Sequence, residues 1–327
     1  MRKLTAKKAA ALLPETARDA NKYTRGVCEL VVGSERYPGA AVLAARAANR
    51  AGAGYVRVYT CREAASALRI VSPSCVAASK GEFLQDRHVS LEGRPLAVVL
   101  GCGTECRVDG DILDPAVCEA NFLLDALAAT CAPAVVDGGG LAALACERAV
   151  EVLAERADRG FETVITPHAG EAARLAAFAG LDTDGSAATS SPGLSEDSAA
   201  TSAPDSPEDP DEARLCLALA RSYASVCVLK GPTTYIAAPD MLPEEVFAMR
   251  EGTPALAKAG TGDVLAGVAG SLLAQGCTAL DAACIATVAH ALAGRSAARK
   301  LGERCVCTED VLDRLPRAFR AMADVRD

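Results

Sequence analysis

Short hydrophobic runs recur along the chain and are separated by longer segments rich in Ala and Leu. Residues 27–33, 55–60 and 96–100 are such runs, and their length is typical of strands. The Ala-rich segment 40–51 between the first two predicts a helix that can pack closely. Strands that alternate with helices predict an α/β protein with a parallel sheet. Right-handed crossovers bring the carboxyl ends of such strands to one edge, where ligands usually bind.

The same alternation continues toward the C-terminus. Residues 1–21 place Ala and Leu on one face and Lys and Arg on the other, which predicts an N-terminal helix. Further apolar runs predict strands at 134–136, 163–165, 225–230 and 235–238, the last as a hairpin partner. Helices are predicted at 172–179, 213–224, 263–274 and 281–300.

One acidic segment, residues 182–212, interrupts this alternation. It is made of Ser, Thr, Ala, Pro and nine acidic residues without Lys or Arg, so it cannot bury enough apolar surface to offset the cost of ordering. We predict a disordered insertion within a single domain that spans residues 1–327. The net charge of −8 becomes about +1 without it, so phosphate binding would depend on local groups. The chain has no Trp and no basic arm, and no nucleic-acid partner is predicted.

Fourteen cysteines are scattered through apolar runs, and the chain starts without a signal-like segment. This usage predicts reduced thiols in a cytoplasmic protein. The closest pairs, Cys102 with Cys106 and Cys305 with Cys307, lack a second pair or a His at zinc-finger spacing, so no metal site is predicted there. Gly, Arg or Asp interrupts the longest apolar stretches, and no membrane span is predicted.

The sharpest chemical signal is a glycine-rich segment before the apolar helix 263–274. Gly260, Thr261 and Gly262 leave backbone N–H groups accessible at a helix start, which is the ordinary form of a phosphate site. It is no Walker loop, because no Gly-Lys-Ser/Thr follows. Asp263 has two interpretations: it caps the helix as its N-cap residue, or its carboxylate acts as a general base beside the bound phosphate.

Two other strand ends carry polar residues with two interpretations each, and one further histidine lies in a predicted helix. Lys230 either covers the core or contacts a nucleotide phosphate. His168 either contacts a substrate or holds its loop, and Glu171 favours the start of the next helix by its charge. His290 lies in an apolar helix, which predicts a core histidine with its hydrogen bonds satisfied.

Six motifs in this order resemble the NAD(P)H-hydrate dehydratase family: VVGSERYPGAAVLAARAANRAGAGYV, VLGCGT, VVDGGGL, VITPHAGEAARL, VLKGPTTYI and GTPALAKAGTGDVLAGVAGSLLAQG. The resemblance covers about residues 21–290 without the acidic segment. It implies a ribokinase-like three-layer α/β/α sandwich with a mostly parallel central sheet. It also implies a nicotinamide nucleotide repair enzyme, a hydro-lyase. The expected reaction is ADP- or ATP-dependent dehydration of the S epimer of NADH or NADPH hydrate, which releases AMP or ADP and phosphate.

The resemblance assigns roles to residues of this chain. Asp263 is the implied base. The residues implied to contact the hydrate are Ala40, Gly103, His168 and Asp263. The residues implied to hold the nucleotide are Lys230, Gly231, Pro232, Thr233, Thr234, Gly260, Thr261 and Gly262. Mg²⁺ is implied as a screen between nucleotide phosphates, although the sequence offers no obvious dedicated ligand for it.

Some positions depart from the family pattern. Asp137 is followed by three glycines, where the family often has Asp-Ala-Asp-Ala-Leu-Asn. Gly101-Cys102-Gly103 stands where the family has a Gly-Pro-Gly turn, and Asn21 replaces a frequent His. Many relatives carry an N-terminal epimerase domain that this chain has no room for, so a separate epimerase is the expected partner. A homo-oligomer, with a tetramer as the common form, is also implied.

Two other functions stay open at this point. One is an ATP-dependent kinase for a hydroxymethylpyrimidine or hydroxyethylthiazole, which shares the glycine-rich phosphate loop. The other is a non-catalytic nucleotide-binding protein, suggested by the glycines after Asp137. The motifs TPHAGE and GTPALA favour the dehydratase, and retention of Asp263 favours catalysis.

Overall fold

The predicted apolar runs pair into one sheet in a computed structural model that describes residues 1–86, 88–106, 119–181 and 209–326. The order of its strands is β1-β10-β9-β8-β7-β6-β5-β2-β3-β4. The strands are β1 (Arg2–Lys3), β2 (Val27–Val31), β3 (Tyr55–Thr60), β4 (Val76–Ser79), β5 (Leu96–Leu100), β6 (Ala134–Val136), β7 (Thr163–Ile165), β8 (Val226–Leu229), β9 (Thr234–Ala237) and β10 (Phe247–Met249).

Most strand pairs are parallel, as predicted. β2 pairs in parallel with β3 on one side and β5 on the other, with Val31 opposite Leu100. The pairs β8–β9 and β9–β10 are antiparallel, which confirms the predicted hairpin. Every residue of β2 and β5 is buried, because helices cover both faces of the sheet.

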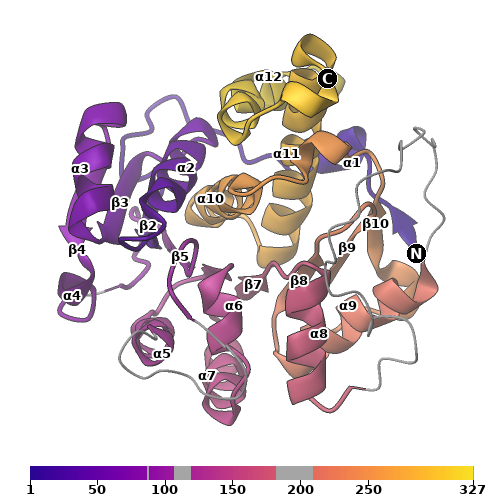
Figure 1. Cartoon of the computed structure of the whole chain (residues 1–327), viewed down its shortest axis with the longest axis horizontal. Coiled ribbons are helices and arrows are strands. Elements are labelled where there is room, and N and C mark those ends of the chain that lie inside the picture. The colour runs from indigo at the N-terminus through magenta and orange to yellow at the C-terminus, as the bar shows by residue number, and fades with distance from the viewer. Residues whose placement is uncertain (87, 107–118, 182–208, 327) are drawn as a thin grey trace.

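Helices form a layer on each face of the sheet (Figure 1). Helices α2, α10 and α11 lie on one face with α12 outside them, and α5, α7, α8 and α9 lie on the other. This arrangement confirms the three-layer α/β/α prediction. The helices are α1 (Ala6–Ala11), α2 (Pro38–Arg50), α3 (Arg62–Val71), α4 (Lys80–Phe83), α5 (Ala120–Ala129), α6 (Gly139–Ala143), α7 (Glu147–Asp158), α8 (Ala169–Phe178), α9 (Pro210–Ser222), α10 (Thr261–Ala274), α11 (Ala279–Leu301) and α12 (Thr308–Arg326).

Helix α10 is the centre of its layer and positions the site. All its residues except Gly262 and Asp263 are buried, as expected of a helix that is apolar on every side. A Cβ at Gly270 would overlap Val99 of β5, and one at Gly267 would overlap the carbonyl of Ala44 in α2. The two glycines therefore let α10 lie close to both the sheet and α2.

We expect Gly267→Ala to destabilise the protein by about 1–3 kcal/mol, because the added methyl overpacks the contact between α10 and α2. Gly39→Ala in α2 is the matched control, since a Cβ there meets no atom within 4 Å. That control should be neutral or stabilise by up to about 1 kcal/mol. Urea unfolding of both variants checks this, and equal stabilities would show that α10 can move away from α2.

Three predictions about elements need correction or fall outside the structure. The predicted helix 1–21 is wrong: helix α1 covers only Ala6–Ala11, because Arg2–Lys3 pairs with β10 and Pro14 cannot continue a helix. Helix α9 begins at Pro210 and not at 213, because Asp209 caps it by accepting from the N–H groups of residues 211 and 212. The rest of the predicted acidic insertion, residues 182–208, lies outside the described residues.

Among the described residues, no helix combines the length and the apolar character that crossing a membrane requires.

Candidate active site

The carboxyl ends of four neighbouring strands meet the N-terminus of α10. Cys102 follows β5, Asp137 follows β6, and Thr166 follows β7. Lys230 follows β8, and Asp263 lies in the first turn of α10. These residues come from five segments that the sequence separates widely, and together they form the candidate active site.

Asp137 is the buried acceptor at the centre of this site. Its side chain is only 5% exposed. Its Oδ1 accepts hydrogen bonds from Lys230 Nζ at 2.8 Å and from Thr166 Oγ1 at 2.6 Å. Burial alone would raise the pKa of Asp137, but the charge of Lys230 and these hydrogen bonds outweigh it and lower that pKa. Asp137 is therefore an anion at neutral pH.

Lys230 is held between two carboxylates. Its Nζ lies 2.8 Å from Asp137 Oδ1 and 3.9 Å from Glu171 Oε2. Burial opposes the charge of Lys230, but the two carboxylates prevail and raise its pKa. The side chain keeps 22% of its surface exposed. It is therefore a fixed cation at the ligand edge, which argues against the interpretation of Lys230 as a mere cover over the core.

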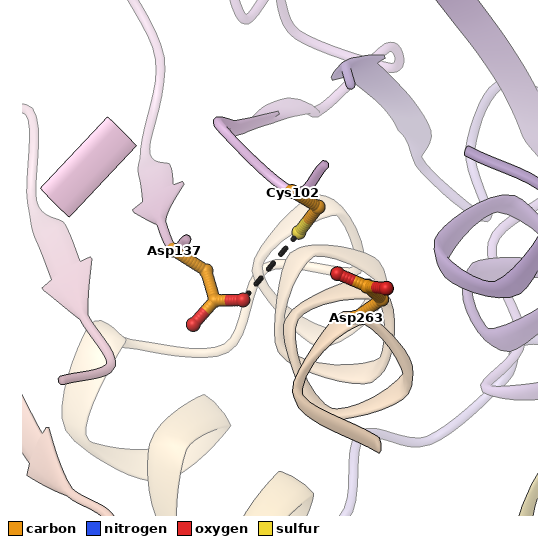
Figure 2. A group of neighbouring side chains, drawn as sticks. All are labelled: Cys102, Asp137 and Asp263. Atoms are coloured by element: carbon orange, nitrogen blue, oxygen red, sulfur yellow. Dashed lines mark hydrogen bonds between the residues drawn. The ribbon is translucent and has the colours of Figure 1, made fainter. Parts of the chain in front are cut away.

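Asp263 is not the N-cap of α10, so that interpretation is wrong. The N-cap is Gly260, whose φ of +91° suits glycine, and Asp263 is the third helical residue. Burial, and then the negative charge of Asp137, raise the pKa of Asp263 to about 7, although Lys230 and Cys102 oppose the shift. Figure 2 shows its carboxyl group near Cys102 and Asp137. A carboxyl group with this pKa is suited to accept a proton near neutral pH.

The glycine-rich segment places helix N–H groups beside the Lys230–Asp137 pair. Val264 donates the first intrahelical bond, to Gly260 O at 3.3 Å, so the N–H groups of Gly262 and Asp263 precede it. A Cβ at Gly262 would lie 3.4 Å from Lys230 Nζ and 3.5 Å from Asp137 Oδ2. Glycine here keeps the space between the helix start and Lys230 open to an anion.

The side chain of Thr261 has a structural role. Its Oγ1 donates within the loop toward Leu256 O at 2.8 Å and Lys258 O at 2.9 Å. The hydroxyl thus fixes the turn before α10. Its backbone N–H also donates within the loop, to Lys258 O at 3.3 Å, so the structure gives this residue a role in shaping the turn.

The turn after Lys230 presents backbone to solvent. Gly231 and Pro232 are exposed, whereas Thr233 and Thr234 are buried and lead into β9. The Oγ1 atom of Thr233 has no hydrogen-bond partner among the described residues. The structure thus brings the predicted nucleotide residues to one edge, on either side of Lys230.

The predicted hydrate contacts fall into two groups. Ala40 and Gly103 are neighbours, because a Cβ at Gly103 would overlap that of Ala40. His168 is 57% exposed, and its Nδ1 accepts from the N–H groups of Gly170 and Glu171 at 3.1 and 3.3 Å. Glu171 accepts in turn from His168 N at 2.8 Å. His168 therefore caps helix α8 as its loop interpretation predicts, and its contact with a substrate stays a prediction; Glu171 stabilises the helix start as predicted.

His290 is buried in α11 as predicted, but its hydrogen bonds are not all satisfied. The Nε2 atom has no partner among the residues that the structure describes. Burial, and then the charge of Lys230, lower the pKa of His290 to about 4. The ring is therefore neutral, and the prediction of a satisfied core histidine is wrong at Nε2.

Sequence reasoning missed Asp137, Thr166 and Cys102 as members of the site. The available signal was the position of each, directly after a predicted strand. Sulfur of Cys102 and carboxylate oxygens of Asp137 and Asp263 lie within 4.8 Å of one another, a group of atoms that could hold a metal ion. The prediction that Cys102 takes no part in a metal site rested on spacing along the sequence. Such spacing carries no information on a contact between residues as far apart as Cys102, Asp137 and Asp263.

Comparison with known proteins adds three findings. The model of a family described as NAD(P)H-hydrate dehydratase matches residues 28–317. An ADP-dependent (S)-NAD(P)H-hydrate dehydratase of Xanthomonas campestris is 30% identical over 93% of this chain and 94% of that protein. A bifunctional NAD(P)H-hydrate repair enzyme of Moorella thermoacetica is 32% identical over 99% of this chain but 54% of its own length. The chain spans about half the length of the bifunctional relatives.

A solved structure matches the fold. The ADP/ATP-dependent NAD(P)H-hydrate dehydratase of Bacillus subtilis, crystallised with ATP and Mg²⁺, superposes with a TM-score of 0.73 at 23% identity. The match covers 98% of each chain. At this identity the likeness establishes the fold, and it confirms the predicted architecture.

Proposed function

Because the chain belongs to the NAD(P)H-hydrate dehydratase family, we propose that it restores NADH and NADPH from the S epimers of their hydrates. The reaction consumes ADP or ATP and releases AMP or ADP with phosphate. The observation that carries this proposal is the match over residues 28–317, which includes every residue of the candidate site. Asp263, with its pKa of about 7 beside a helix N-terminus, supplies the base that such a reaction needs.

The nucleotide phosphates are proposed to lie between the start of α10 and Lys230. Backbone N–H groups of Gly262 and Asp263 and the positive end of the helix attract anions there. The ammonium group of Lys230 adds a full charge whose position Asp137 and Glu171 fix. Gly231 and Pro232 then offer exposed backbone to the rest of the nucleotide.

The reaction follows from the poor leaving ability of hydroxide. Asp263 removes the proton of the ring hydroxyl, whose oxygen attacks the terminal phosphorus of ADP or ATP and displaces AMP or ADP. The hydroxyl is now a phosphate ester. The lone pair of the adjacent ring nitrogen expels phosphate, and loss of a ring proton restores the dihydronicotinamide. Lys230 and the helix N–H groups stabilise the charge that develops on the transferred phosphoryl group.

Mg²⁺ is proposed as a cofactor that enters with the nucleotide. The carboxylates of Asp137 and Glu171 lie on two sides of Lys230, and Mg²⁺ commonly uses one or two carboxylates together with phosphate oxygens. Both carboxylates already pair with Lys230, so the ion would share them with its ammonium group and take its other ligands from the nucleotide and water. When bound, Mg²⁺ neutralises phosphate charge.

A dehydratase confined to the S epimer leaves the R epimer to an epimerase, and we propose that a separate epimerase acts with this chain. A homo-oligomer, expected to be a tetramer, and a cytoplasmic location complete the proposal.

The competing functions have less support. A kinase would leave a stable phosphate ester, and a non-catalytic protein would bind nucleotide without turnover. The match to a dehydratase family over most of the chain does not favour either of them.

The proposal predicts recovery of absorbance at 340 nm when the protein is added to NADH hydrate with nucleotide. Parallel reactions with ADP, ATP and no nucleotide determine which one is used. Purified R epimer is the control and should stay unchanged. Recovery without any nucleotide would contradict the coupling to phosphoryl transfer.

A further inference from the structure

A thiol lies among the carboxylates of the candidate active site. Cys102 is fully buried, and its sulfur lies 3.7 Å from Asp137 Oδ2. The sulfur and oxygens of Asp137 and Asp263 are all within 4.8 Å of one another. Figure 2 shows the three side chains converging from the turn after β5, the end of β6 and the first turn of α10. One sulfur and two oxygen ligands thus face one point.

The two oxygens of Asp137 have different surroundings. Oδ1 accepts from both Lys230 and Thr166. Among the described residues, the partner recorded for Oδ2 is the weak thiol donor of Cys102. A side chain that is 5% exposed therefore directs an under-used acceptor toward the sulfur and Asp263. A bound cation would stabilise this oxygen, because burying an acceptor that has only a weak donor costs free energy.

The ligand set selects the kind of cation. Magnesium and calcium avoid thiols, whereas Zn²⁺ and Cd²⁺ bind thiolate together with carboxylate. Three protein ligands with an open fourth position are typical of a non-structural zinc site. Zn–S and Zn–O bonds of about 2.3 and 2.0 Å put tetrahedral ligands about 3.5 Å apart. Small rotations of three side chains would reach that spacing from the present one.

We propose that Cys102, Asp137 and Asp263 form a site for a thiophilic divalent cation of the Zn²⁺ type, and that the bound ion inhibits the enzyme. The thiol releases its proton as the Cys102–metal bond forms, so affinity rises with pH. The ion occupies the Asp263 oxygen that would otherwise accept the substrate proton. Lys230 faces the far oxygen of Asp137, and Glu171 lies beyond it. The inhibition rests on the proposed function, whereas the binding does not.

The test measures binding and activity separately, with Cd²⁺ and Zn²⁺ as probes. The parent is Cys305→Ser/Cys307→Ser, which keeps the full chain and removes the two thiols that are exposed among the described residues. Titration with Cd²⁺ should show the ultraviolet absorption of a Cd²⁺–thiolate bond, and Cys102→Ala should lose one equivalent of it. The matched control, Cys75→Ala, removes another buried thiol and should retain it. Asp263→Asn should weaken the site about 10-fold or more.

In the activity assay, Zn²⁺ should inhibit the parent and the Cys75→Ala variant alike. Residual activity of Cys102→Ala should need about 10-fold more Zn²⁺ for half inhibition. Equal Cd²⁺ binding by Cys102→Ala and the parent would overturn the proposal. If Cys102→Ala fails to fold, equal Cd²⁺ binding by Asp263→Asn and the parent would overturn it instead. If the parent has no dehydratase activity but Cys102→Ala still loses the Cd²⁺ signal, the proposed function is refuted and the metal site is supported.

Discussion

Replacing Asp263 by Asn is expected to lower kcat by about 10²- to 10⁴-fold, which is the usual contribution of a positioned base. The amide cannot accept the hydroxyl proton, although it has nearly the same shape. KM for the nucleotide should change little, because the helix N–H groups and Lys230 remain. Steady-state kinetics with circular dichroism as the check on folding measures the effect.

Asp281→Asn is the matched control for that variant. Asp281 is also the third residue of its helix, where Thr278 is the N-cap and accepts from its N–H. A purely electrostatic role at a helix start would make the two variants behave alike. Full activity in Asp263→Asn, or an equal loss in both variants, would show that Asp263 is not the base.

Because the pKa of Asp263 is about 7, the activity and the stability of the protein should depend on pH in opposite directions. Activity should rise through about pH 7, because the base works only when ionised. Stability should fall as pH rises from the ordinary pKa of 3.8 to the folded pKa of about 7 and then level off, because over that interval the folded state holds a proton that the unfolded state has lost. Asp263→Asn should therefore raise Tm at pH 8 and leave it almost unchanged at pH 4. No gain in Tm at pH 8 would contradict the cost of ionising Asp263, which arises from its burial and then from the charge of Asp137.

Replacing Lys230 by Met is the second change with a large expected effect. It leaves Asp137 buried without its countercharge, which is expected to cost about 3–5 kcal/mol of unfolding free energy. Affinity for the nucleotide should also fall by about 10- to 100-fold, as the loss of one charged hydrogen bond implies. Lys300→Met, on the exposed end of α11, is the control and should change neither quantity.

A double variant separates the two effects of Lys230. Asp137→Asn with Lys230→Met removes both charges, so most of the lost stability should return, whereas nucleotide affinity should not. Urea unfolding and titration calorimetry with ADP measure the two quantities. Recovery of both would assign Lys230 to the fold alone, and recovery of neither would show that Asp137 has a further structural role.

The strands could be predicted from the sequence because each is short, apolar and bounded by Gly or polar residues. The runs at 55–60, 96–100, 134–136 and 163–165 are β3, β5, β6 and β7 with the predicted bounds. The N-terminal prediction failed because the backbone of Arg2 and Leu4 bonds to β10, a pairing across more than 240 residues. Local periodicity carries no information on such a partner.

The candidate site could be predicted only in part for the same reason. The glycine-rich start of α10 is a local signal, and it located Asp263 and the proposed phosphate space. The ion pair of Lys230 with Asp137 joins residues 93 positions apart, and it exists because the strands that carry them are separated in the sheet by β7 alone. A cysteine after an apolar run indicates a core residue, and only the turn after β5 aims Cys102 at two carboxylates.

The measurement that tests the central claim most directly is the stoichiometry of the complete reaction. Purified S-NADH hydrate and ADP are incubated with the protein, and NADH, AMP and phosphate are measured over time. One AMP and one phosphate for each NADH, all abolished by Asp263→Asn, is the predicted result. AMP formed with a stable phosphorylated product and no NADH would identify a kinase and contradict the account.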